Sequence, residues 1–338
     1  MYHTTGIISN KYVFTTLAFF LHLQFINARN LEKQYTNNIM MIRPANFMYN
    51  EQTAVTNAFQ TNDEGGRASN VNVLALQEFD NFVLKLKEAG VNVIVMHDSL
   101  SPIKPDAIFP NNWVSFHGNG TVITYPMATV NRRIERREDI IDALGLVFKV
   151  NSRYSFESSE EDNQFLEGTG SMILDRENKI VYACLSPRTD IFLLDRFCLL
   201  MGYGLVSFYS TDREGKEIYH TNVMMAIADQ YAVVCLDSIK DEDKRMEVRD
   251  SLEKTGKEVI ELTFDQVLHF AGNMLQVEGH PGKRILVMSQ QAYDSLTREQ
   301  IDKINSYNPI LAVPIPTIEK YGGGSVRCMM AEVFLPKR

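Results

Sequence analysis

The chain has 338 residues, of which 45% are hydrophobic and 22% are charged, and its formal net charge is −8. This composition is typical of a globular protein, and the length allows one large domain or two small ones. The acidic balance argues against a broad nucleic-acid-binding surface. The densest basic run, NRRIERRED at 131–139, is interleaved with acidic residues and is predicted to be a solvated helix face.

The first 39 residues are predicted to be an extension that precedes the folded domain. Within them, Lys11–Ala28 is an apolar stretch that starts at a basic residue and has about the length of a secretory signal. His22 and Gln24 interrupt the stretch, which is too short and mixed to predict a membrane span. Two interpretations stay open: a signal-like segment for secretion or periplasmic export, and a mis-assigned start before a domain at residues 40–338.

The four cysteines are far apart, and they form no CxxC pair and no zinc-finger spacing with a histidine. Three lie in apolar runs, where a cysteine usually packs as a small hydrophobe: Cys184, Cys198 and Cys235. The pattern predicts a reduced, cytoplasmic protein without a metal site. No P-loop and no GxGxxG follows a predicted strand, so the sequence gives no support for a nucleotide cofactor.

From residue 41 onward, apolar spacing predicts helices that are each followed by a strand. The first helix is 72–90, where apolar residues recur at three- and four-residue steps, and its strand is 91–97. The same order recurs at 190–203 and 204–210, at 241–256 and 257–262, and at 296–305 and 309–315. Hairpins are predicted between these units, at 112–127 and 172–185. We therefore predict one α/β domain, and not a simple all-parallel doubly wound sheet.

Four short stretches combine turn residues with groups that can do chemistry: FPNN at 109–112, LEGTG at 166–170, YHTN at 219–222 and GGGSVRC at 322–328. Each one alone is typical of a turn. A catalytic cysteine, however, needs a base or a positive neighbour, which is usually distant in sequence. Among the seven histidines, His220 is the candidate partner for Cys328, because it ends a polar turn and enters a long apolar segment.

Read in order, the four stretches resemble the guanidino-group modifying, or amidinotransferase-like, superfamily over nearly all of residues 41–338. Its members include arginine deiminase, dimethylarginine dimethylaminohydrolase, glycine amidinotransferase and succinylarginine dihydrolase. The opening MMIRPANFMYNEQTAVTNAFQ is similar to the citrulline utilisation hydrolase branch. The resemblance implies a five-bladed, pseudo-symmetric α/β propeller, the pentein fold, with the active site in a central channel.

The resemblance also implies a role for each catalytic residue. Cys328 matches the family's nucleophile, and His220 matches its general acid/base. Glu167 matches the carboxylate that binds the planar head group of the substrate and orients the histidine. Arg43, beside Pro44 in the first predicted strand, is a candidate for the substrate's α-carboxylate, since arginine pairs bidentately with carboxylates. A surface arginine is an equally good interpretation of Arg43.

Two positions depart from the pattern of arginine deiminase, which has Asp where this chain has Asn112 and Asn222. Carboxylates suit a guanidinium, which offers only N–H donors and a positive charge. An Asn can instead donate to the carbonyl oxygen of a neutral ureido group and accept from its N–H. The substitutions favour citrulline over arginine as the substrate. A shift of the alignment by one residue would give Asn111 the role of Asn112.

The sequence therefore predicts a cysteine-dependent hydrolase of non-peptide C–N bonds that converts L-citrulline to ornithine, ammonia and carbon dioxide without a metal or organic cofactor. The predicted partner is a small-molecule amino acid, with no nucleic acid and no membrane, and a homo-oligomer stays open. Three alternatives also stay open. They are an arginine deiminase or a dihydrolase of another guanidino or ureido compound, an inactive amino-acid-binding protein, and a secreted interaction protein.

Overall fold

The computed structural model of the chain describes residues 32–62 and 68–338. The signal-like segment Lys11–Ala28 and most of the predicted extension lie outside the described residues. Residues Lys33–Arg338 form one unit, and its first strand begins at Asn38. Within residues 32–62 and 68–338, no helix is both long and apolar enough to cross a membrane.

The strands of the described residues form five sheets of three strands each. In every sheet the middle strand pairs antiparallel with one neighbour and parallel with the other. This mixture of directions confirms the predicted α/β class. The sheets consist of β15 (Ala331–Glu332), β1 (Asn38–Arg43) and β2 (Asn92–His97); β3 (Val114–Phe116), β4 (Thr121–Thr124) and β5 (Ser152–Ser155); β6 (Ile173–Asp175), β7 (Ile180–Leu185) and β8 (Gly204–Tyr209); β9 (Met225–Ile227), β10 (Tyr231–Val234) and β11 (Glu258–Glu261); and β12 (Leu275–Glu278), β13 (Arg284–Ser289) and β14 (Ile310–Val313).

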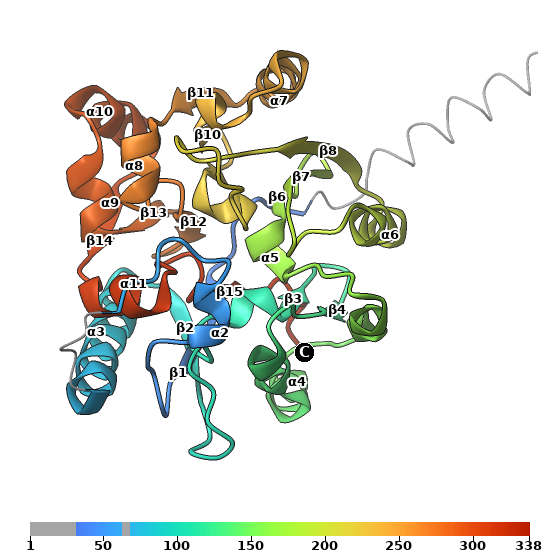
Figure 1. Cartoon of the computed structure of the whole chain (residues 1–338), viewed down its shortest axis with the longest axis vertical. Coiled ribbons are helices and arrows are strands. Elements are labelled where there is room, and N and C mark those ends of the chain that lie inside the picture. The colour runs from blue at the N-terminus through green and yellow to red at the C-terminus, as the bar shows by residue number, and fades with distance from the viewer. Residues whose placement is uncertain (1–31, 63–67) are drawn as a thin grey trace, which may run out of the picture. The chain divides into compact units, whose positions relative to one another are not determined.

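In each sheet, helical segments link the two strands of the parallel pair. These helices are α3 (Ala68–Glu88), α4 (Glu138–Gly145), α6 (Ile191–Met201), α7 (Glu242–Lys254), and α9 (Gln290–Ser295) with α10 (Arg298–Tyr307). The others are α2 (Glu51–Ala54), α5 (Gly168–Ser171), α8 (Phe264–Leu268) and α11 (Pro316–Gly322). Figure 1 shows α3, α4, α6, α7 and α10 at the margin of the view, and the short α2 and α5 near its centre.

The predicted helices and hairpins are confirmed, with ends that differ by a few residues. The helix predicted at 190–203 is α6, which begins after Asp190 because that side chain accepts from the N–H groups of Phe192 and Leu193. It ends where Gly202 turns to φ 71°. The predicted hairpins contain β3 with β4 and β6 with β7.

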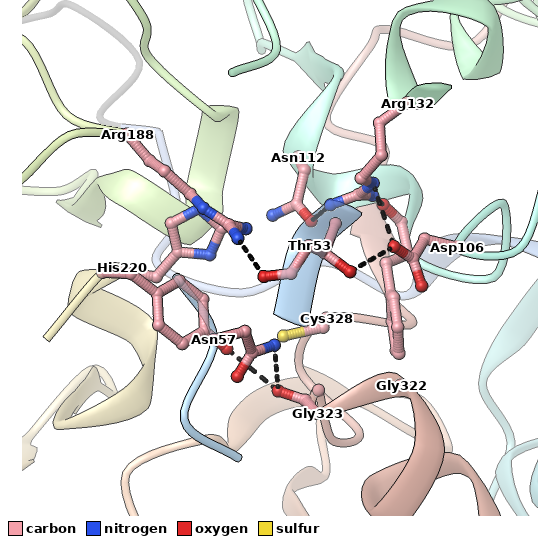
Figure 2. A pocket seen from close by; sticks show the side chains of 13 residues that line it. Thr53, Asn57, Asp106, Asn112, Arg132, Arg188, His220, Gly322, Gly323 and Cys328 are labelled. Carbon is pink, nitrogen blue, oxygen red and sulfur yellow. Dashed lines mark hydrogen bonds and ion pairs between the residues drawn. The ribbon is translucent and has the colours of Figure 1, made fainter. Parts of the chain in front are cut away.

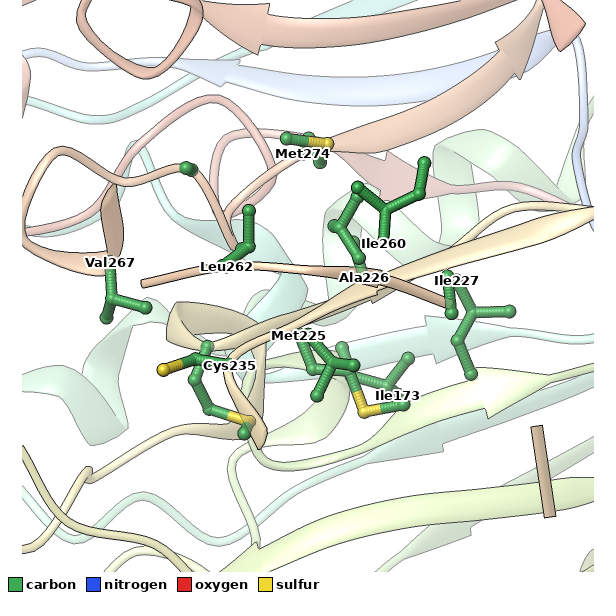
Figure 3. Close-up of a cluster of buried hydrophobic side chains, with 14 of the residues drawn as sticks. Ile173, Met225, Ala226, Ile227, Cys235, Ile260, Leu262, Val267 and Met274 are labelled. Atoms are coloured by element: carbon green, nitrogen blue, oxygen red, sulfur yellow. The ribbon is translucent and has the colours of Figure 1, made fainter. Parts of the chain in front are cut away.

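One core cluster packs the sheets of β6–β8 and β9–β11 against α7 (Figure 3). Figure 3 labels Met225 and Ile227 of β9 and Ile260 of β11, which are buried in this cluster. Val248 of α7 belongs to the same cluster. Full burial of each such side chain stabilises the fold by about 1.5–3 kcal/mol. Cys235 packs here as a small hydrophobe, and burial raises the pKa of its thiol. The cluster therefore fixes β9 and the turn before it, which carries YHTN.

Candidate active site

Three of the four motifs line one pocket (Figure 2), and Glu167 of the fourth, LEGTG, contacts the lining residue His220. FPNN forms the 3-10 turn η1 (Pro110–Asn112), and LEGTG places Glu167 at the start of α5. His220 directly precedes the 3-10 turn η4 (Thr221–Val223), and α5 packs against both η1 and η4. The pocket is lined by Thr53, Asn57, Asp106, Phe109, Asn112, Arg132, Arg188, Tyr219, His220, Gly322, Gly323, Gly324 and Cys328.

The sulfur of Cys328 receives a hydrogen bond from Asn222, whose Nδ2 lies 3.3 Å from Sγ. Cys328 is 5% exposed, at the wall of the pocket. A hydrogen-bond donor favours the charged form of an acidic group over its neutral form, and the thiolate is the nucleophilic form of cysteine. Asn222 is thus in contact with the predicted nucleophile, an arrangement that the sequence did not indicate.

The Glu167 carboxylate is buried and surrounded by three partners. Its Oε2 lies 2.8 Å from His220 Nε2 and 3.5 Å from Arg188 Nη1, and its Oε1 accepts from the backbone N–H of Ala128 at 3.0 Å. Burial alone would raise the pKa of Glu167, but Arg188 and His220 hold it well below its usual range. Burial is the main cause that lowers the pKa of His220, although the Glu167 carboxylate opposes the shift. The result is an ionised carboxylate that accepts from the Nε2–H of a neutral imidazole, with Nδ1 as the basic nitrogen.

Asn112 and Asn222 each leave one end of the side-chain amide without a partner, and the two free ends differ. Arg132 donates through Nη1 to Asn112 Oδ1 at 2.9 Å, which fixes the amide orientation. Within the described part of the chain, Asn112 Nδ2 has no hydrogen-bond partner, and neither has Asn222 Oδ1. Figure 2 shows the nitrogen of Asn112 turned away from Arg132. Asn112 and Asn222 therefore offer one unpaired amide donor and one unpaired amide acceptor.

Arg132 itself is held by buried carboxylates. Its Nη2 lies 2.8 Å from Glu135 Oε2, and its Nε lies 3.7 Å from Asp106 Oδ2. Burial raises the pKa of Glu135 to about 7, although Arg132 opposes the shift. The sequence analysis placed the whole run 131–139 on a solvated face, which is wrong for Arg132 and Glu135, because these side chains are 3% and 1% exposed. The other residues of the run are half-buried or exposed, so the charge pattern did not distinguish the buried side chains.

The glycines before Cys328 pack tightly. A Cβ on Gly322 would lie 2.8 Å from the Phe109 ring, and one on Gly324 would lie 3.0 Å from the same ring. Gly323 has φ +62°, and its carbonyl accepts from Tyr219 Oη at 2.9 Å. All three glycines are buried. Close packing and a left-handed backbone therefore require these glycines.

A segment of residues 53–61 covers this loop. Asn57 Nδ2 donates to the Gly323 carbonyl at 3.2 Å, and the Thr61 N–H donates to the Lys320 carbonyl at 2.9 Å. Arg188 Nη2 donates to the Thr53 carbonyl at 3.0 Å. The covering segment is thus connected both to the loop of Cys328 and, through Arg188, to the Glu167 carboxylate.

Four predicted site residues do not line the pocket: Glu167 and Asn222, which contact the lining residues His220 and Cys328, and Arg43 and Asn111. Arg43 makes two hydrogen bonds of 2.8 Å to the Asp80 carboxylate, and 32% of its side chain is exposed. The structure therefore corresponds to the surface-arginine interpretation and places other guanidinium groups, those of Arg132 and Arg188, at the pocket. Asn111 is fully buried beside Gly168, where a Cβ would lie 2.3 Å from the Asn111 carbonyl oxygen.

Gly170→Ala is expected to reduce kcat/KM at least about a hundredfold, because small displacements of reacting groups are that costly. An added Cβ would lie 2.4 Å from Asn112 Nδ2 and 2.8 Å from His220 Nδ1. The loss of stability should stay near 1–3 kcal/mol, the usual range for overpacking. Kinetics and urea unfolding measure the two effects. Gly145→Ala is the matched control, since its Cβ would meet only Val150 at 3.9 Å; equal activity in both variants would contradict the prediction.

The five mixed sheets and the pocket of Cys, His, Glu and Asn define the arginine deiminase-related, amidinotransferase-like class of guanidino-group hydrolases. The model of the family described as N,N dimethylarginine dimethylhydrolase, eukaryotic, matches residues 43–335. The chain belongs to this family. A comparison with curated protein sequences gives no match.

Solved structures share the fold. The N-terminal domain of ArgZ, an arginine dihydrolase from the ornithine–ammonia cycle in cyanobacteria, is 17% identical with a TM-score of 0.68, over 88% of this chain and 98% of that domain. The chain spans 41% of full-length ArgZ. AgrE in complex with ornithine and NAD+ is 18% identical with a TM-score of 0.67, over 89% of this chain and 40% of AgrE. A dimethylarginine dimethylaminohydrolase variant, as its S-methyl-L-thiocitrulline adduct, is 14% identical with a TM-score of 0.60, over 88% of this chain and 99% of that one.

Proposed function

We propose that the protein hydrolyses the ureido group of L-citrulline, giving ornithine, ammonia and carbon dioxide. The observation that carries this proposal is the pair of unpaired amide atoms, Asn112 Nδ2 and Asn222 Oδ1. A ureido group has a carbonyl oxygen that accepts from a donor and N–H groups that need an acceptor. A guanidinium has no acceptor for Asn112 Nδ2. An unmatched buried polar group costs about 1–3 kcal/mol, which supports discrimination against the guanidinium.

In the proposed reaction, the thiolate of Cys328 attacks the ureido carbon and a tetrahedral oxyanion forms, with Asn112 as its donor. The proton that Cys328 loses passes to Nδ1 of His220, which gives it to the leaving nitrogen and then takes one from the water that attacks the carbon of the thioester-like intermediate. Glu167 holds the substrate N–H groups and the imidazole. One water is consumed overall, and the carbamate that is released decomposes to carbon dioxide. Either ammonia or ornithine can leave first.

The α-carboxylate of the substrate is proposed to pair with Arg132 or Arg188 in place of Arg43. Both guanidinium groups are buried and line the pocket. A planar guanidinium can bind a carboxylate through two parallel hydrogen bonds. This assignment supports a small-molecule amino acid as the partner of the site.

We also propose that residues 40–338 form a single domain in which the five sheets are the blades of a five-bladed propeller. One strand of each sheet, antiparallel to the middle strand, follows a segment that reaches the site: β3, β6, β9, β12 and β15. The four cysteines are unpaired and buried, which supports a reducing, cytoplasmic location.

A second candidate function is hydrolysis of a guanidino substrate, either arginine or a methylated arginine. The description of the matching family favours it, as it names dimethylarginine. Glu167, ionised within the site, would suit a cationic head group. The two candidates differ in whether an oxygen or a nitrogen faces Asn112.

Purified protein is expected to release ornithine and ammonia from L-citrulline, and to do so at least about tenfold faster than it acts on L-arginine or dimethylarginine. Ornithine, citrulline, ammonia and dimethylamine are measured in parallel reactions. Cys328→Ser is the control and should be inactive on every substrate. Turnover of arginine or dimethylarginine alone would overturn the citrulline proposal but keep the nucleophile. No turnover of any of them would favour the amino-acid-binding alternative.

A further inference from the structure

Asn273 lies against the sulfur of Cys328 but belongs to none of the four motifs. Its Nδ2 is 3.3 Å from Sγ and 3.0 Å from the carbonyl oxygen of Asn222. Its Oδ1 accepts from the backbone N–H of Arg327 at 3.0 Å. Asn273 is 1% exposed. One amide thus contacts the predicted nucleophile, the loop that carries it and the turn η4.

These three contacts fix which end of the amide faces the sulfur. The Arg327 N–H can donate only to the oxygen of the amide, so the nitrogen must face Asn222 and Cys328. The NH₂ group has two hydrogens and two acceptors, the Asn222 carbonyl and Sγ. Asn273 is therefore a hydrogen-bond donor to the sulfur in this geometry.

The local backbone brings Asn273 close to Cys328 and to η4. Phe270 has φ 61°, a conformation that costs energy for a residue other than glycine. A Cβ on Gly272 would lie 2.2 Å from the Val223 carbonyl oxygen, so only glycine lets this loop touch η4. Strain and a glycine contact in the three residues before one polar side chain are typical of a functional position rather than of a simple turn.

Asn273 also stands at a position equivalent to other site residues in the fold. It precedes β12, as Asn112 precedes β3 and Asn222 precedes β9. Cys328 precedes β15 in the same way, and Glu167 lies further upstream, before α5 and β6. Each of the five sheets therefore contributes one polar side chain from the segment before the strand that is antiparallel to its middle strand.

The charged groups around the sulfur of Cys328 indicate the role of Asn273. Arg327 and Tyr219 interact electrostatically with Cys328. The Arg327 guanidinium, however, is paired with Glu332 at 2.9 Å. Burial keeps the pKa of His220 low, so the imidazole is neutral at rest and gives no full positive charge to a thiolate. The amide donors from Asn222 and Asn273 are direct partners of the sulfur.

We propose that Asn273 is a further catalytic residue, whose amide N–H donates to Cys328 Sγ and stabilises the thiolate before substrate binds. Together, Asn222 and Asn273 supply two hydrogen-bond donors to the negatively charged sulfur. This inference rests on the proposed role of Cys328 as the nucleophile, but not on the identity of the substrate.

The test is the pH dependence of alkylation of Cys328 by iodoacetamide in the full chain, followed by peptide mass spectrometry. Asn273→Asp keeps an oxygen for the Arg327 N–H but removes the donor to Sγ. Its alkylation rate at neutral pH is expected to fall about tenfold or more, in line with the strength of a hydrogen bond to a charged group. The midpoint of the pH–rate curve should move upward, while the limiting rate at high pH stays unchanged.

Asn273→Ala and a matched control make the result decisive. Asn273→Ala should shift the midpoint in the same direction but less, because it adds no negative charge. Asn308→Ala removes another buried amide, one that accepts from Tyr231 and Gln276, and should lower stability without moving the midpoint. Equal midpoints in the unchanged protein and in both Asn273 variants would overturn the role of Asn273 but not the proposed function. An unreactive Cys328 in the unchanged protein would overturn the proposed function as well.

Discussion

Glu167→Gln is expected to lower kcat at least about a thousandfold, within the range attributed to general acid–base catalysis. Three contacts change at once, because Glu167 accepts from His220, faces Arg188 and accepts from the Ala128 N–H. A glutamine can orient the imidazole through a neutral hydrogen bond, but it cannot stabilise the imidazolium that forms during proton transfer. The measurement is kcat and KM on the best substrate; retention of a tenth of the kcat would contradict the role assigned to Glu167.

The same substitution has a second consequence, for stability. It leaves the buried Arg188 without its carboxylate, which costs about 3–5 kcal/mol at neutral pH when one partner of a buried pair is removed. Since the folded-state pKa of Glu167 is lowered from 4.5, its contribution is complete above pH 4.5 and is lost as the pH falls below that value. Urea unfolding should therefore show the difference between the two proteins narrowing below pH 4.5.

Glu135→Gln provides the contrast for this stability experiment. Glu135 is also buried and paired with an arginine, but its pKa is raised to about 7. The raised pKa means that the folded protein disfavours the ionised form of Glu135. The unchanged protein therefore loses stability relative to this variant as the pH rises from 4.5 towards 7. The two glutamate variants should thus respond to pH in opposite directions.

The meeting of the four motifs is predicted from the family resemblance, and the structure adds that each motif lies before a strand antiparallel to the middle strand of its sheet. A glycine or asparagine turn followed by an apolar run is a local pattern, and it is visible for Asn112, Glu167 and Asn222. The same pattern occurs at Asn273, in FAGNMLQVE at 270–278, and could have been found by comparing it with the other turns.

Other parts of the site could not be predicted because they depend on contacts between distant segments. Arg188 reaches Glu167 and the segment at Thr53 only after folding, and no local pattern distinguishes it from other arginines. The glycines at 322–324 are typical of a turn by sequence, whereas close contacts with Phe109 and Asn57 in the folded chain explain their presence. Arg43 looked suitable by its position in the first strand, but Asp80 on α3 satisfies it.

Asn112→Asp is expected to lower kcat/KM for citrulline about a hundredfold or more and to raise the ratio of arginine to citrulline turnover. The substitution replaces the unpaired Nδ2 by a carboxylate oxygen, which would repel the ureido oxygen. Arg132 can still donate to Oδ1, so the side chain should stay in place. The measurement is kcat/KM for both substrates, with thermal unfolding as a check that the variant is folded.

Asn111→Ala separates the two ways of aligning FPNN. Asn111 is buried but does not line the pocket, so its loss should lower stability and leave the preference for citrulline unchanged. If Asn111→Ala abolished citrulline turnover while Asn112→Asp did not, Asn111 would be the residue that faces the substrate. If neither variant altered the preference, the choice between a ureido and a guanidino group would have to lie with Glu167 and Asn222. The free amide donor would then be a feature of packing and not of specificity.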